Sequence, residues 1–291
     1  MHALPAVASL KHSFPGSTLS WVIKPRWAPL LEGNPYVDEV IPFVRTRAGI
    51  VALRRRLRER RFDLIVDLQG LIQSALVAAS AKGEKIVGLA RGQARESLAA
   101  LFYSTGVHTH ATHRVDQYLE IAVGAGANNM LRKFSLPPGT PEGILPEGRF
   151  VLACPLAGWK WKQWPLERYA ALAQQVPLVV NGPPEAADIL ASITGAHVHL
   201  SGLSGLIDAT RKATAVVGVD SGPVHLAAAL GKPGDAIYGP TNPASHGPYG
   251  GTIEVLRDSS AVTNYKRRDE ENPAMRAVSA EQVMEILRRI L

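Results

Sequence analysis

Short apolar runs alternate with segments of helical periodicity along this chain. Their period and composition predict strands over 19–23, 39–43, 62–67, 85–89, 151–154, 178–181, 197–200, 215–219 and 236–238. Amphipathic helices are predicted between the strands, and the last one, over 280–290, carries its apolar residues on one side. Such β/α alternation is typical of doubly wound α/β domains with parallel sheets, whose ligands bind beyond the carboxyl ends of the strands.

The chain has 291 residues, enough for two domains that each bury a core. A proline-rich stretch over 135–141 resists both helix and central strand, so it marks the boundary. We therefore expect an N-terminal domain over 1–134, a linker over 135–149, a C-terminal domain over 150–278 and a closing helix over 279–291. A helical pattern already starts at 1–7, so we expect the first domain to lack its first strand.

The positive charge is concentrated in the first half. The net charge is +7, and residues 1–133 hold 18 Lys and Arg against 10 Asp and Glu. Six arginines occupy 54–61, on a predicted helix whose apolar stripe is Ile50, Val51, Leu53 and Leu57. A solvated helix face, an anionic acceptor and an acidic membrane surface all remain open. Nucleic acid is not expected as a partner, because no nucleic-acid-binding motif and few aromatic residues accompany the arginines.

Two further features bear on the compartment. The single cysteine, Cys154, excludes an internal disulfide and fits a reducing cytoplasm. No apolar run approaches the roughly 20 residues that a membrane-spanning helix needs, and nothing resembles a secretory signal. We expect a soluble, cytoplasmic protein.

The stretch 216–225 is the strongest candidate for chemistry. An apolar β-branched run ends at Asp220, and Ser221, Gly222 and Pro223 then begin a predicted helix. Free amide groups and the helix dipole at such a turn favour a phosphate, while Asp220 and Ser221 can bind hydroxyls beside it. The alternative is an ordinary strand-to-helix turn in which Ser221 or Asp220 is only the helix cap.

Other strand ends carry weaker signals. Lys162 stands near a helix start where it could pair with a diphosphate, Glu185 follows another strand where it could bind ribose, and a loop with Thr241 follows a third. Each could equally be a packing or surface feature. Gln69 follows the strand over 62–67 as a further candidate. His108, His110 and His113 lie close in sequence but lack a cysteine or clear carboxylate partner, so no metal site is expected.

These turns resemble those of the lipopolysaccharide heptosyltransferases, most closely heptosyltransferase I. The resemblance covers nearly the whole chain and rests on the motifs at 2–5, 66–71, 93–96 with 98–103, 162–165, 220–222 with His225, and 238–243. It implies a glycosyltransferase of the B-type fold, with two Rossmann-like domains facing across a cleft and a final helix that crosses back to the first domain.

The resemblance also implies the reaction. Heptose would pass, with inversion and without metal or other cofactor, from ADP-L-glycero-D-manno-heptose to the Kdo sugar on lipid A, at the cytoplasmic face of the inner membrane. By position, Lys162, Ser221 and Gly222 would hold the diphosphate, Glu185 the ribose and Asp220 the heptose. His225 and Thr241 would complete the donor site, with Lys162 and His225 acting in catalysis. Gln69 and Arg95 would contact the acceptor.

One part of the family pattern has no match. The catalytic base of the family is an aspartate in a loop after the first strand, and no position of this chain corresponds to it. We therefore expect an upstream segment in the natural gene, and donor binding without useful transfer by the chain as given. Heptosyltransferase II and a catalytically impaired nucleotide-sugar-binding protein remain as alternatives.

Overall fold

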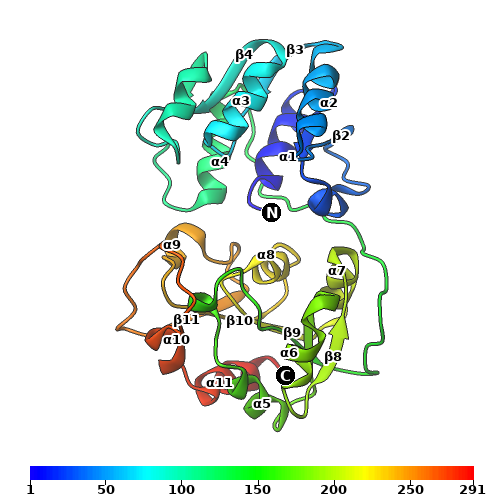
Figure 1. Ribbon diagram of the computed structural model, residues 1–291, viewed down its shortest axis with the longest axis vertical. Coiled ribbons are helices and arrows are strands. Elements are labelled where there is room, and N and C mark those ends of the chain that lie inside the picture. The colour runs from blue at the N-terminus through cyan, green and yellow to red at the C-terminus, as the bar shows by residue number, and fades with distance from the viewer. The chain divides into compact units, whose positions relative to one another are not determined.

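The computed structural model describes residues 1–291 and divides them into two compact units (Figure 1). The N-terminal unit comprises His2–Leu136, and the C-terminal unit comprises Pro137–Leu291 together with Met1. The expected proline-rich boundary therefore lies at this division, although residues from Pro137 onward belong to the C-terminal unit. One reason is that Glu142 accepts hydrogen bonds from the backbone of Gly202 and Gly205.

The C-terminal unit is built on one parallel sheet of six strands in the order β11-β10-β9-β6-β7-β8. The strands are β6 (Val151–Cys154), β7 (Leu178–Gly182), β8 (His197–Leu200), β9 (Ala215–Val219), β10 (Gly234–Tyr238) and β11 (Ile253–Arg257). The helices are η3 (Lys160–Lys162), α5 (Leu166–Ala173), η4 (Pro184–Ala186), α6 (Ala187–Ala191), α7 (Leu203–Lys212), α8 (Gly222–Ala229), α9 (Pro243–His246), α10 (Pro273–Ala277) and α11 (Ala280–Ile290).

Both faces of this sheet are covered, which explains why its central strands read as nearly continuous apolar runs. Residues of α5, α6 and α11 pack on one face around Trp164 and Tyr169. Residues of α7 and α8 pack on the other face around Val224 and Tyr238. The unit is thus a three-layer doubly wound domain, as the sequence predicts.

The closing helix α11 differs from expectation in its position. We expected it to cross back to the first domain, whereas its buried residues Val283, Met284 and Leu287 lie in the core of the C-terminal unit. There α11 packs against β10 and α5. The apolar stripe of α11 is therefore buried against the sheet of its own unit.

The N-terminal unit holds two separate parallel sheets, β1-β2 and β3-β4-β5. Its elements are α1 (Leu4–Ser13), β1 (Ser20–Ile23), η1 (Pro25–Leu31), β2 (Glu39–Pro42), α2 (Arg47–Arg58), β3 (Arg61–Val66), α3 (Ile72–Ser80), β4 (Lys82–Leu89), η2 (Ser97–Phe102), β5 (Thr105–Val107) and α4 (Arg114–Gly124). Helices α1 and α4 pack together over β4, around Leu10, Val87 and Ile121. The expected doubly wound sheet is therefore present as two parts.

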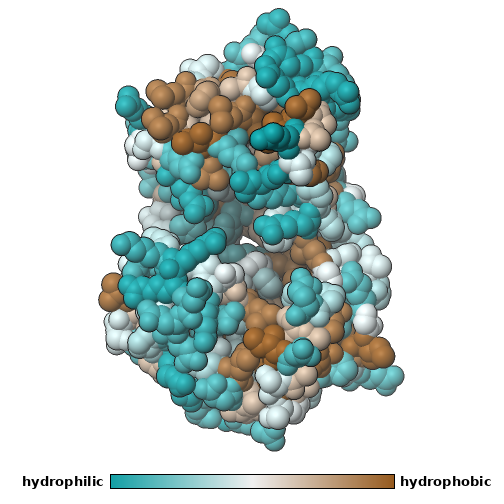
Figure 2. Space-filling model, viewed as in Figure 1, coloured by the Kyte–Doolittle hydropathy of each residue, from teal (hydrophilic) through white to brown (hydrophobic).

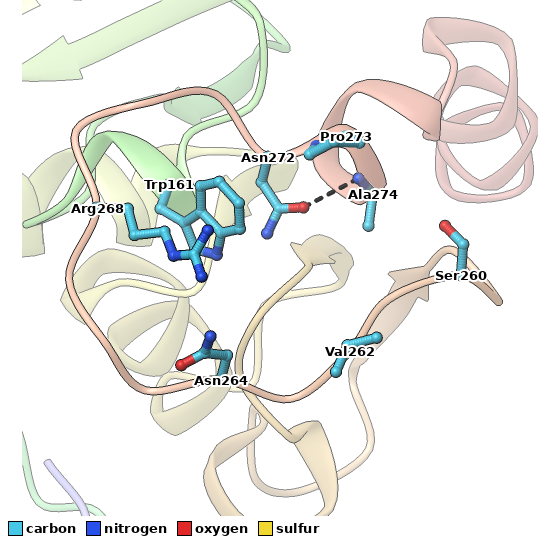
Figure 3. A pocket seen from close by; sticks show the side chains of 8 residues that line it. All are labelled: Trp161, Ser260, Val262, Asn264, Arg268, Asn272, Pro273 and Ala274. Carbon is cyan, nitrogen blue, oxygen red and sulfur yellow. Dashed lines mark hydrogen bonds between the residues drawn. The ribbon is translucent and has the colours of Figure 1, made fainter.

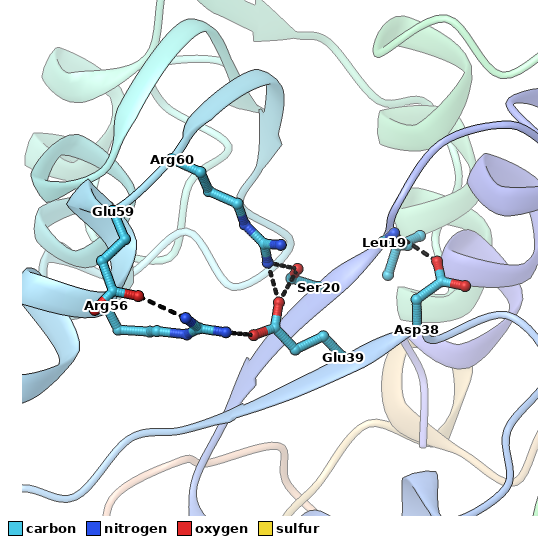
Figure 4. A network of polar contacts seen from close by, with 7 residues as sticks. All are labelled: Leu19, Ser20, Asp38, Glu39, Arg56, Glu59 and Arg60. Atoms are coloured by element: carbon cyan, nitrogen blue, oxygen red, sulfur yellow. Dashed lines mark hydrogen bonds and ion pairs between the residues drawn. The ribbon is translucent and has the colours of Figure 1, made fainter.

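The apolar stripe predicted on α2 is buried only in part. Leu53 and Leu57 are buried in a core with Ile41, but Ile50 and Val51 are exposed. Several arginines near α2 form ion pairs instead of a free basic face. Arg56 pairs with Glu39 and Glu59, and Arg60 pairs with Glu39 and donates a hydrogen bond to the hydroxyl of Ser20 (Figure 4).

This network fixes a carboxylate at the start of β2. Although burial opposes ionisation of Glu39, hydrogen bonds from Ser20, Arg56 and Arg60 outweigh it and lower the pKa of that carboxyl. Arg61 is also paired, with Glu84 on the neighbouring strand. No ion pair engages Arg54, Arg55 or Arg58.

None of the helices combines the length and apolar character that crossing a membrane requires.

Candidate functional site

The candidate donor residues gather at one edge of the C-terminal sheet. Lys162 follows β6, Glu185 follows β7, Ser221 follows β9 and Thr241 follows β10, and these four strands are neighbours in the sheet. Because all strands are parallel, their carboxyl ends meet at the same edge. The chain order reverses between β6 and β9, which is where open α/β sheets form their ligand crevice.

The amino end of α8 is open to a ligand. Ser221 occupies the cap position, yet its hydroxyl makes no cap hydrogen bond, and its buried Oγ has no hydrogen-bond partner in the protein. Nothing lies within 4 Å of the space beside Gly222 that a Cβ would fill. Pro223 in the first turn lacks the N–H that a helix start leaves unbonded in any case. This hydroxyl therefore does not serve as the helix cap, and it remains without a partner at the end of α8 where the helix dipole favours an anion.

Lys162 forms an ion pair with the aspartate of this turn. Its Nζ donates to Oδ2 of Asp220, and it also lies 4.6 Å from the ring centre of Trp159. His225, one turn into α8, places Nε2 3.8 Å from Oδ1 of the same carboxylate. Three residues that the sequence predicted separately therefore form one cluster.

The electrostatics of this cluster keep Asp220 ionised. Burial alone would raise the pKa of the Asp220 carboxyl, but hydrogen bonds with His225 and Lys162 and the charge of Lys162 hold that pKa well below its usual range. Thr241 contributes in the same direction. A fixed anion that orients a lysine beside a helix amino end can bind hydroxyls while the lysine meets a phosphate.

The turn between β6 and α5 is held by contacts that sequence reasoning missed. Arg267 lies 5.6 Å from the ring centre of Trp159 and Arg268 lies 4.7 Å from that of Trp161, while the backbone N–H of Trp161 donates to the carbonyl of Arg268. These partners are more than a hundred positions apart, so no local pattern signals them. Trp164, in contrast, is buried and donates from Nε1 to the carbonyl of Val278.

A pocket of about 320 Å³ adjoins this turn (Figure 3). It is lined by Trp161, Ser260, Val262, Asn264, Arg268, Asn272, Pro273 and Ala274. The carboxamide of Asn272 caps α10 by accepting from the N–H of Ala274. The pocket therefore lies beside the Lys162 turn, and none of the predicted donor residues lines it.

Glu185 and Thr241 occupy different environments at the sheet edge. Glu185 is exposed on η4, directly after β7, so its carboxylate is accessible to a ligand. Thr241 is buried beyond the end of β10. The two residues thus stand at opposite sides of the β9 and β6 turns.

In the N-terminal unit the structure joins the two loops that carry Gln69 and Arg95. Gly70 adopts a φ of +66°, and a Cβ there would lie 3.2 Å from the backbone nitrogen of Arg95. The carbonyl of Gly70 accepts from the N–H of Glu96. Both loops follow the carboxyl ends of neighbouring strands, β3 and β4, and the side chains of Gln69 and Arg95 are exposed there.

Asp67 organises this junction. Its Oδ1 accepts from the N–H groups of Gln69 and Gly70, and its Oδ2 accepts from the hydroxyls of Ser74 and Tyr103. Asp67 is buried and its carboxylate is engaged in stabilising the turn, so Gln69 is left as the accessible side chain.

Two histidines of the N-terminal unit, His2 and His113, lie against each other at the start of α4. His113 caps α4 by accepting from the N–H of Val115, and its ring lies edge-on to that of His2. No group of three or more His, Cys, Asp or Glu side chains is arranged to hold a metal ion.

The fold and this sheet edge are those of a doubly wound α/β domain, and the comparisons define the class of protein. Residues 50–275 match glycosyltransferase family 9 (heptosyltransferase), so the chain belongs to this family and is a glycosyltransferase.

Named relatives agree. The chain is 30% identical over 277 residues to lipopolysaccharide heptosyltransferase 1 of Pseudomonas aeruginosa, with 86% of this chain and 78% of the relative covered. It is 29% identical to lipopolysaccharide heptosyltransferase 1 of Escherichia coli K12, with 88% and 89% covered. Lipopolysaccharide heptosyltransferase 2 of the same strain is also 29% identical, with 84% and 80% covered.

Solved structures share the fold over the whole chain. The E. coli heptosyltransferase WaaC with ADP has a TM-score of 0.77 at 24% identity and covers 100% of this chain and 95% of its own. A glycosyltransferase family 9 structure from Veillonella parvula reaches a TM-score of 0.83 at 20% identity, with 99% and 92% covered. The expectation of a heptosyltransferase-like α/β fold is thereby confirmed.

Proposed function

We propose that this protein transfers L-glycero-D-manno-heptose from ADP-heptose to the Kdo sugar of the lipopolysaccharide inner core, as a heptosyltransferase I. The observation that carries the proposal is the amino end of α8, where Ser221 has an unbonded hydroxyl and the largely buried ammonium of Lys162 pairs with the preceding Asp220. A relative solved with ADP and another with ADP-2-deoxy-2-fluoro heptose are consistent with this donor class.

In the proposed mechanism the C-terminal unit acts on the leaving group. The bond between the anomeric carbon and the β-phosphate oxygen breaks, and its electron pair leaves with ADP. The amides of α8 and Lys162 stabilise the charge that develops on the diphosphate, so no metal ion is required for this role. Asp220 and His225 hold the heptose hydroxyls, with Thr241 beside them, and Glu185 binds the ribose. The acceptor hydroxyl oxygen attacks the anomeric carbon on the face opposite ADP and forms the new glycosidic bond, which inverts that carbon. The hydroxyl proton passes to water, because the family's catalytic aspartate has no counterpart among the residues of this chain.

The N-terminal unit binds the acceptor in this proposal. Gln69 and Arg95 lie together on exposed loops after β3 and β4 and can bind the carboxylate and phosphate groups of a Kdo-lipid A acceptor. One unit would then bind the acceptor and the other the donor, with the protein peripheral to the cytoplasmic face of the inner membrane.

A transfer assay tests the proposal. Purified protein is given ADP-heptose and detergent-dispersed Kdo-lipid A, and product is measured by mass spectrometry with the K162A variant in parallel. The expected result is slow formation of heptosylated Kdo-lipid A by the wild type, about 10²- to 10⁴-fold below the rate that a general base would support, and a further strong reduction in K162A. Product only on an acceptor that already carries one heptose would favour heptosyltransferase II, which also has similar relatives. Donor binding without product on either acceptor would favour a catalytically impaired nucleotide-sugar-binding protein.

A further inference from the structure

Three exposed leucines form an apolar ridge on the N-terminal unit. Leu76 on α3 is 51% exposed, and Leu98 and Leu101 on η2 are 57% and 66% exposed. In a 3₁₀ helix residues three positions apart share a face, so Leu98 and Leu101 point the same way. Helices α3 and η2 pack against each other, which brings the three leucines onto neighbouring elements. Figure 2 shows the apolar surface over these two helices.

A cationic helix borders this leucine ridge. Helix α2 packs against α3 on the side away from η2 and presents Arg54, Arg55 and Arg58, which no ion pair engages. Val51, 68% exposed, lies on the same side of α2 as these arginines. In Figure 2 the polar surface of α2 lies beside the apolar surface of α3 and η2 on the same face. Arginines flanking exposed leucines are the arrangement by which a protein binds an anionic lipid interface.

The leucine ridge also continues from the candidate acceptor site. Arg95 precedes η2 by two residues, and Gln69 precedes α3 by three, so both chain segments run from a polar acceptor residue to an exposed leucine. An acceptor whose charged head is bound at Gln69 and Arg95, and whose lipid tail remains in a bilayer, would place that bilayer near the leucines. A large exposed apolar patch without such a partner is uncommon on soluble proteins.

We propose that the leucine ridge and the free arginines of α2 dock this protein onto the surface of an anionic lipid bilayer, with Leu76, Leu98 and Leu101 entering the interfacial layer. The inference rests on the proposed function, because a lipid-linked acceptor is what makes bilayer contact useful.

Vesicle co-sedimentation tests this surface without donor or acceptor. The full chain is mixed with vesicles of phosphatidylethanolamine and phosphatidylglycerol, and with vesicles of phosphatidylcholine alone. We expect binding to the anionic vesicles, weakened roughly tenfold or more in L98S/L101S because two leucines no longer enter the interface. The triple variant R54Q/R55Q/R58Q should also bind more weakly and lose most of its salt dependence. The matched control is I144S, which removes an apolar residue that is 79% exposed on the other unit, and its binding should equal that of wild type.

Three outcomes would overturn the inference. They are absence of wild-type binding to anionic vesicles, equal binding by wild type and L98S/L101S, and lipid-free self-association that L98S/L101S abolishes, since the ridge would then join two copies of the chain. Thermal unfolding is the folding control: the melting temperature of L98S/L101S should be close to that of the wild type, because both leucines are exposed. The transfer assay tests the proposed function independently of this surface. Absence of heptose transfer to detergent-dispersed acceptors would contradict the proposed function, whether or not the protein binds vesicles.

Discussion

Lys162 and Asp220 form an ion pair across the point where the chain order of the C-terminal sheet reverses. Lys162 follows β6 and Asp220 directly follows β9, and these two strands are hydrogen-bonded neighbours. Both side chains are largely buried, so the pair fixes the lysine beside the amino end of α8 before any ligand arrives. An electrostatic site that is organised in advance needs little rearrangement when charge develops on a leaving group.

Replacing Lys162 by alanine should weaken ADP binding by about one to two orders of magnitude, because a hydrogen bond to a charged group is worth about 1.5–3 kcal/mol. Isothermal titration calorimetry with ADP measures this effect. Lys160 is the matched control, since it lies on the same short helix and carries the same charge but is exposed and makes no ion pair. Equal loss of affinity in K160A and K162A would mean that only general positive charge matters at this turn.

Removing the hydroxyl of Ser221 distinguishes a role in ligand binding from a role in capping α8. Because its buried Oγ has no hydrogen-bond partner in the protein, S221A should leave the free energy of unfolding unchanged or slightly raised. The same variant should weaken ADP binding by about fivefold to tenfold, as expected for one lost hydrogen bond. Denaturant unfolding and calorimetry measure the two effects.

Ser279 provides the comparison for Ser221. It caps α11, accepting from the N–H of Gln282 in a reciprocal capping box. S279A should therefore lower the free energy of unfolding by about 1 kcal/mol and leave ADP affinity unchanged. If S221A were destabilised as much as S279A, Ser221 would be an ordinary cap and the phosphate assignment would lose its main argument.

The gathering of the candidate donor turns at one edge of the C-terminal sheet could be predicted from sequence because its signals are local. Each turn joins an apolar run to a helix start, and parallel strands bring such turns to one edge without further information. The pairing of Lys162 with Asp220, 58 positions away, has no local signal. The same holds for the stacking of Arg267 and Arg268 on tryptophans of the β6–α5 turn.

The N-terminal unit was harder to predict for a physical reason. Its sheet is divided in two, which no local pattern signals, and periodicity alone does not tell which apolar residues of α2 are buried, since Leu53 and Leu57 are buried whereas Ile50 and Val51 are exposed. The strands β5 and β11 were also missed: β5 has three residues, and β11 lies at the edge of its sheet with Glu254 and Val255 exposed. Edge strands carry weaker apolar patterns than central ones.

Arg95 is expected to act on the acceptor alone. R95Q should raise the KM for Kdo-lipid A about tenfold and change the KM for ADP-heptose little, because the guanidinium would lose a charge-assisted contact to an acidic group. Steady-state kinetics with each substrate varied in turn measure both constants. R91Q, at an exposed arginine four positions earlier, should resemble wild type. A change in donor KM with R95Q would contradict the assignment of this loop to the acceptor.

The buried carboxyl of Asp235 should make the stability of the C-terminal unit fall as pH rises. Burial, with a smaller contribution from the charge of Glu254 on the adjoining strand, raises the pKa of Asp235 from 3.8 to about 8, and neither oxygen has a hydrogen-bond partner. Between these pH values the folded state binds a proton that the unfolded state has lost. Unfolding therefore releases a proton, and the free energy of unfolding decreases with pH by up to about 1.4 kcal/mol per unit until the folded group also ionises.

The isosteric variant D235N removes this ionisation and should flatten the decrease in melting temperature between pH 5 and about 8, so that the variant is more stable than wild type at the upper end. Thermal unfolding followed by circular dichroism across this range measures the slope. D188N, which alters an exposed aspartate of the same unit, should retain the wild-type slope. Parallel curves for D235N and wild type would show that Asp235 is ionised in the folded protein, and Arg289, which lies near enough to lower its pKa, would then be the partner to examine.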